Sequence, residues 1–270
     1  MAGTATSGGM ARFLRRSWRA ATLALALALG IAVVVPGGRV FAGAWTLDAG
    51  KGQVIASGLH STASESFPAA GGDPAVVGFA KTSASLFFEH GWTDRLTVIG
   101  DLEIGSESEA TSGYARSGPS HFAAGARLRL FKAAGFVASA QLTGRLEDAG
   151  EGLDSPAIEP RLLAGYGFSV QGMPAFVDGQ AGYRWRAGGA DEVKLDLSAG
   201  IRPFADWLLL AQVFSTMSVG GERYSHHKAQ GSVVYDINDR WSVQAGIFAT
   251  IAGETALKER GVVSAIWYRY

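Results

Sequence analysis

Two neighbouring stretches decide the fold: PAFVDGQAGYRWRA at residues 174–187 and EVKLDLSAGIRP at residues 192–203. In both stretches every charged side chain falls at an even-numbered position, Arg184 and Lys194 among them. The odd-numbered positions hold apolar residues or glycine. Because successive side chains of a strand point to opposite faces, this alternation predicts β-strands with one charged face and one apolar face.

The same period of two continues from Gly52 to the C-terminus in stretches of about ten residues, the length of a tilted transmembrane strand. About twelve strands are expected, an even number that is typical of single-chain bacterial barrels. They are predicted at 52–61, 77–90, 95–106, 119–131, 135–147, 157–168, 174–187, 192–203, 206–220, 225–237, 240–251 and 261–270.

The connections between these strands alternate in length. Short turns rich in Gly, Asn, Asp and Pro are expected at 91–94, 132–134, 171–173, 203–205 and 238–239. Longer connections are expected at 62–76, 107–118, 148–156, 188–191, 219–224 and 252–260. Short periplasmic turns that alternate with longer outer loops are typical of outer-membrane barrels.

A soluble β-sandwich or lipocalin-like barrel would show the same alternation. The aromatic residues favour the membrane, because Trp92, Trp207 and Trp241 fall at short turns while Tyr183 and Trp185 fall near the opposite end of their strand. Such placement predicts an aromatic girdle at each membrane interface.

Residues 1–42 have the pattern of a cleaved signal peptide. Four arginines precede an apolar run at 20–35, and Val40-Phe41-Ala42 offers small residues for a cut before Gly43. The alternative is an uncleaved membrane anchor. Residues 1–42 hold five of the 24 basic residues and none of the 24 acidic ones, so 43–270 carries 19 against 24, a net charge of −5. Nothing in that balance indicates nucleic-acid binding.

The C-terminus resembles the assembly signal of outer-membrane barrels. Ile266, Tyr268 and Tyr270 alternate along the last predicted strand, and the sequence ends on an aromatic residue. The segment WTDRLTV at 92–98 resembles a turn and strand found in outer-membrane channel-like proteins. Among these is the transporter-like group named after the phenol meta-cleavage pathway. The resemblance implies transport and recognition by the barrel assembly machinery, and it carries over no binding residue.

The inward face of the barrel is the first candidate site. Its predicted basic residues are Lys81, Arg127, Arg129, Arg145, Arg161, Arg184, Arg186, Lys194, Arg202, Lys228 and Arg269. Its predicted acidic residues are Glu89, Asp101, Glu103, Glu147, Glu159, Asp178, Glu192, Asp196 and Asp236. Rings of charge can set ion selectivity, and Arg127, Arg129, Arg184 and Arg186 would favour anions. Alternatively, the charges pair across a narrow lumen and fill it.

A membrane-embedded lipid hydrolase is a less favoured alternative. His60, His121, His226 and His227 are predicted at outer strand ends, but a hydrolase needs a histidine beside a nucleophile and an orienting partner. Adjacent Ser225 and His226 would point to opposite faces of their strand.

The sequence therefore predicts an all-β protein, a transmembrane antiparallel barrel at 43–270 in the bacterial outer membrane. We expect a narrow passive channel for small solutes, without enzymatic activity, cofactor, bound metal, nucleotide site or plug domain. The alternative is a structural or adhesion barrel with an occluded lumen that acts through its outer loops. Expected partners are outer-membrane lipid, lipopolysaccharide and the assembly machinery.

Overall fold

The computed structural model describes residues 43–69, 72–148 and 152–270, so the predicted signal peptide lies outside the described residues. The described chain is all β. Its strands are β1 (Gly52–Phe67), β2 (Val76–Thr93), β3 (Leu96–Glu109), β4 (Tyr114–Ala133), β5 (Phe136–Asp148), β6 (Leu153–Val170), β7 (Met173–Arg186), β8 (Asp191–Phe204), β9 (Trp207–Val219), β10 (Ser225–Asp236), β11 (Trp241–Glu254), β12 (Ala256–Leu257) and β13 (Arg260–Arg269).

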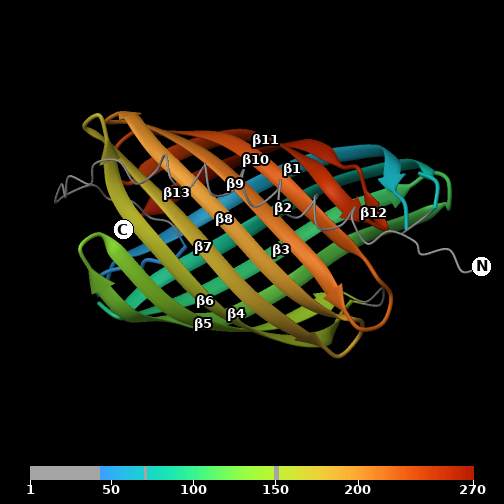
Figure 1. The fold of residues 1–270 in the computed structure, drawn as a ribbon, viewed down its shortest axis with the longest axis horizontal. Coiled ribbons are helices and arrows are strands. Elements are labelled where there is room, and N and C mark those ends of the chain that lie inside the picture. The colour runs from blue at the N-terminus through green and yellow to red at the C-terminus, as the bar shows by residue number, and fades with distance from the viewer. Residues whose placement is uncertain (1–42, 70–71, 149–151) are drawn as a thin grey trace, which may run out of the picture.

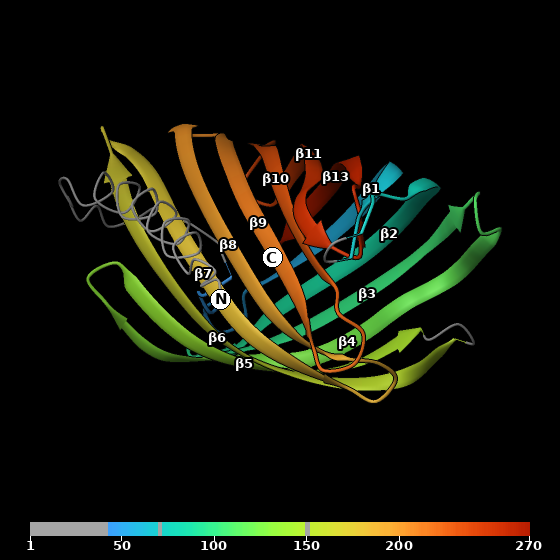
Figure 2. The same cartoon turned by 45° about the vertical axis from the view of Figure 1, so that its right-hand side comes forward.

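The sheet closes on itself to form a barrel (Figures 1 and 2). Long strands that follow one another in the sequence pair antiparallel, and β1 pairs with both β2 and β13: Gln53 is in register with Glu89 on one side and with Arg269 on the other. The last residue completes the seam, because the backbones of Gly52 and Tyr270 exchange two hydrogen bonds of 3.0 Å. Closure removes the sheet edges and lets a sheet satisfy its backbone groups without water.

The twelve long strands confirm the predicted count, and the two-residue β12 only extends the outer end of β1. The predicted loops 107–118 and 148–156 are wrong in extent, because β3, β4 and β6 run well into them. In the outer part of the hairpin, Glu107 is in register with Arg116 and pairs with it, 3.1 Å apart. Above the bilayer both faces of a strand can carry polar residues, so the alternation that marks a strand disappears there.

The outward face forms an apolar belt, as a bilayer requires. Leu162 and Ile247, both near the middle of their strands, are 66% and 69% exposed. Aromatic pairs mark both rims: Trp241 contacts Tyr268 at the periplasmic end, with ring centroids 4.7 Å apart, and Tyr183 contacts Trp185 towards the outer end. The predicted transmembrane barrel is therefore confirmed. In the described part of the chain, no helix is long and apolar enough to cross a membrane.

Candidate functional site

The barrel encloses a cavity of about 750 Å³, lined by residues from all twelve long strands and from the segment that precedes β1. Its two sides differ in chemistry. We call the side formed by β5–β8 the charged wall and the side formed by β9–β13 and β1 the apolar wall.

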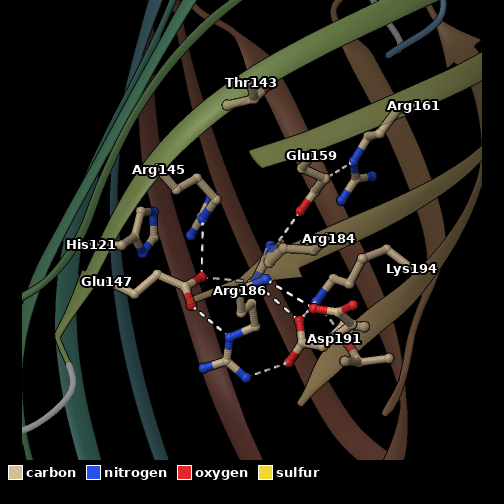
Figure 3. A network of polar contacts seen from close by, with 12 residues as sticks. His121, Thr143, Arg145, Glu147, Glu159, Arg161, Arg184, Arg186, Asp191 and Lys194 are labelled. Carbon is tan, nitrogen blue, oxygen red and sulfur yellow. Dashed lines mark hydrogen bonds and ion pairs between the residues drawn. The ribbon is translucent and has the colours of Figure 1, made fainter. Parts of the chain in front are cut away.

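The charged wall carries a continuous network of arginine and carboxylate groups (Figure 3). Arg184 lies at its centre, with its guanidinium 2.9 Å from Glu147, 2.5 Å from Glu159 and 3.1 Å from Glu192. These side chains alternate along neighbouring strands on the inward face, which is why their charges meet. The network continues in both directions through Arg145, Arg161, Arg186, Lys194 and Asp196.

A second polar group lies on β2, β3 and β4. Asp101 contacts His121, with Oδ2 2.6 Å from Nε2, and the Lys81 ammonium lies 2.9 Å from Glu103. Together with the charged wall, these pairs show that lumen charges are largely neutralised by one another. Three of the four arginines predicted to favour anions are not free: Arg127 pairs with Glu89, and Arg184 and Arg186 pair with glutamates.

The apolar wall faces this network across the cavity. It presents large apolar side chains and a row of amides, namely Ile55, Leu59, Leu208, Leu210, Phe214, Val263, Trp267, Gln212, Gln230 and Gln244. A solute in the cavity would meet charged groups on one side and apolar side chains with neutral amides on the other.

The segment 43–49 lies inside the barrel, at the periplasmic half of the lumen. Its backbone is bound by wall side chains: the amide of Ala44 donates to Asp178 at 2.8 Å, Ser139 donates to the carbonyl of Ala44 at 2.6 Å, and Arg127 donates to the carbonyl of Trp45 at 3.0 Å. Further along, the amide of Leu47 donates to Thr97 at 2.9 Å. Ala44 is fully buried.

Wall glycines make room for this segment. A Cβ atom at Gly165 would lie 2.4 Å from the indole of Trp45, and one at Gly91 would lie 2.2 Å from the carbonyl oxygen of Asp48. Trp45 also packs edge-on against Phe176, with ring centroids 6.1 Å apart. The sequence predicted no plug domain, but it did not predict that the short segment 43–49 would occupy part of the periplasmic half of the lumen. Gly165, which faces inward on β6, was the feature of the sequence that could have indicated this segment.

Most of the predicted lumen residues come together. Arg127, Arg184, Arg186, Glu159, Lys194 and Asp196 take part in the ion pairs above, and Asp178 binds the N-terminal segment. Arg129 lies apart, nearer the periplasmic end of β4, and its side chain makes no ion pair within the described residues. Of the predicted assembly signal, Ile266 is 53% exposed on the outer face, Tyr268 belongs to the aromatic rim, and Tyr270 closes the seam.

Within the described residues, neither His121 nor His227 has the full set of partners that a hydrolase needs. His121 points into the lumen and not to the rim, where it meets Asp101. His227 contacts Ser215 at 2.9 Å between β9 and β10, but no third side chain in the described ranges is bonded to that imidazole. A nucleophile and base without an orienting group do not meet the requirement for activation.

Comparisons with solved structures agree with this architecture. The barrel is similar to an outer-membrane channel from Pseudomonas putida F1, with a TM-score of 0.69, 16% identity, and coverage of 88% of this chain and 100% of that one. The chain has the fold of the small outer-membrane channels. The NanC porin (TM-score 0.54, 8% identity, 80% and 98% covered) and the KdgM porin in complex with disordered oligogalacturonate (TM-score 0.51, 8% identity, 79% and 98% covered) are also similar. These likenesses confirm the resemblance to outer-membrane barrels at the level of fold. No protein-family model and no curated protein sequence matches the chain.

Proposed function

We propose that the protein is a passive outer-membrane channel for small solutes, narrowed at its periplasmic half by the segment 43–49. The observation that carries the proposal is the lumen cavity of about 750 Å³, which is lined partly by polar side chains and enclosed by a complete barrel. A cavity of this size suits single small molecules. The similar fold of solved channels supports the same class of function.

The lumen favours solutes that combine a polar or charged group with an apolar body. The polar group would exchange hydrogen bonds with the charged wall, and the apolar body would lie against residues such as Leu210 and Phe214. Because the arginines that line the cavity are paired, we do not expect it to favour anions. Its lining holds Arg127, Arg145 and Arg161 against Glu89, Asp101, Glu103, Glu159 and Asp196, so we expect a weak preference for cations.

The alternative of a barrel that acts through its outer loops has less support. Outer connections such as 110–113 and 220–224 are short, and they offer little surface for adhesion. Measuring the flux of ions and solutes through the barrel distinguishes a channel from a barrel that acts through its outer loops. Refolded 43–270 in liposomes should admit small zwitterionic solutes in a swelling assay, and it should generate a cation-selective reversal potential in a salt gradient. Folded protein that passes neither ions nor solutes would contradict the proposal.

A further inference from the structure

Asp178 is the exception among the carboxylates of the lumen. Of the nine acidic residues predicted to face inward, eight have a cationic nitrogen within 4.0 Å: Glu89, Asp101, Glu103, Glu147, Glu159, Glu192, Asp196 and Asp236. Within the described residues Asp178 has no ion pair, although it is only 4% exposed. Its hydrogen-bond partners are the neutral amide groups of Ala44 and Gln180, and the charge of Arg127 acts on it only from beyond ion-pair distance. A buried carboxylate without a counter-charge is unfavourable, because burial removes the water that would solvate it.

The start of the segment 43–49 lies directly against this carboxylate. The amide nitrogen of Ala44 is 2.8 Å from Oδ2 of Asp178, and a Cβ atom on Gly43 would be 3.2 Å from Oδ1. The α-nitrogen of Gly43 is bonded to the Cα atom that would carry this Cβ, so it lies within about 6 Å of Oδ1. In an uncleaved chain this nitrogen belongs to a neutral peptide group.

We infer that the chain is cut between Ala42 and Gly43, and that the α-ammonium group freed at Gly43 is the missing counter-charge of Asp178. A signal peptidase would hydrolyse the peptide bond with one water, leaving a carboxylate on Ala42 and an amine on Gly43. The amine takes up a further proton at neutral pH, because a free α-amino group has a pKa of about 7.7 to 8.0. Export and folding are thereby linked, since only the processed chain carries the charge that anchors segment 43–49 in the lumen.

The same pairing explains why glycine stands at this position. A Cβ atom on residue 43 would lie 2.0 Å from Nε2 of Gln180, which itself donates to Asp178 at 3.1 Å. A larger first residue would push Gln180 aside and disturb the site that receives the ammonium. This inference concerns the N-terminal anchor and stands whether or not the lumen conducts.

The test measures the mature N-terminus and the reactivity of its amine. The intact mass of the protein purified from outer membranes should correspond to 43–270. Folded protein is then treated near pH 7 with the N-hydroxysuccinimide ester of acetic acid, and acetylation of Gly43 is followed by mass spectrometry. An ion pair that raises the pKa by about one unit leaves about tenfold less free amine, so acetylation should be about tenfold slower in the native protein than in Asp178→Asn.

Two comparisons control for structure. Asp236→Asn removes a lumen carboxylate that pairs with Arg202 and Arg269, and it should leave the acetylation rate of Gly43 unchanged. A chain that retains Ala42 keeps Asp178 but moves its amine by one residue, and this amine should react like that of an unfolded chain. Heat-modifiable gel migration verifies the fold of each variant. A mature chain that begins elsewhere, equal rates in the native protein and Asp178→Asn, or a protected amine on Ala42 would each overturn the inference.

Discussion

The indole ring of Trp45 lies over Gly165 on the inner wall of the barrel, where a Cβ atom would come within 2.4 Å of the ring. A side chain at residue 165 therefore competes with Trp45 for the same space. Gly165→Val should displace the segment 43–49 and raise single-channel conductance severalfold. Gly231→Val is the matched control, because no atom lies within 4 Å of a Cβ at Gly231. Equal conductance in the two variants would show that the segment does not limit flow.

Arg184 is the central cation of the charged wall, and its removal should be costly. Arg184→Ala leaves Glu147, Glu159 and Glu192 with less compensating charge in a site where the arginine is only 11% exposed. Breaking a buried pair costs about 3 to 5 kcal/mol. We expect a loss of that order in the free energy of unfolding, measured by reversible urea titration in lipid vesicles.

The control for that change is Lys258→Ala, whose partner Glu65 is 2.8 Å away but 55% exposed. An exposed pair contributes at most about 1 kcal/mol. If the two variants lost the same stability, the charged wall would not be a structural network.

The position of the barrel in the bilayer can be tested at Leu162, which faces outward near the middle of β6. Leu162→Arg places a cation near the bilayer midplane and should reduce the free energy of unfolding by about 2 to 4 kcal/mol. Val76 is also exposed but begins β2 at the outer rim, so Val76→Arg should cost about 0 to 1 kcal/mol. Equal costs at the two depths would contradict the assigned membrane belt.

The aromatic C-terminus is expected to guide assembly as well as to close the seam. The Tyr270 ring stacks on His90 with centroids 5.9 Å apart, and a Cβ at Gly52 would lie 2.2 Å from that ring. Tyr270→Ala should lower the amount of folded protein in outer membranes, scored by heat-modifiable migration in a pulse-chase experiment. Tyr235 contacts Trp207 at the periplasmic rim, with ring centroids 4.9 Å apart, and Tyr235→Ala should assemble at the normal rate. Normal assembly of Tyr270→Ala would show that residue 270 is not part of an assembly signal.

The alternation of side chains predicted the barrel because lipid imposes it. A charge on the outer face is costly, so residues such as Arg184 and Lys194 must share one parity, and their strands can be read directly from the sequence. This constraint ends at the membrane surface. The outer part of β4 was therefore missed, and residues such as Arg116 were assigned to a loop.

The contents of the lumen were harder to predict. Parity shows which charges point inward, but not which of them meet, since that depends on strand register and barrel diameter. The segment 43–49 has no repeating pattern of its own, and its position follows from distant wall residues such as Ser139 and Gly165. Only the folded barrel brings those residues together around the segment, so the sequence does not show that the segment narrows the lumen.

Paired conductance recordings test the central claim most directly. Refolded 43–270 and a chain that begins at Lys51 would be compared in planar bilayers under the same salt gradient. The structure predicts discrete, weakly cation-selective openings for 43–270 and severalfold larger openings for the shorter chain. Folded chains of both lengths that stay silent, or that conduct equally, would contradict a channel narrowed by its own N-terminal segment.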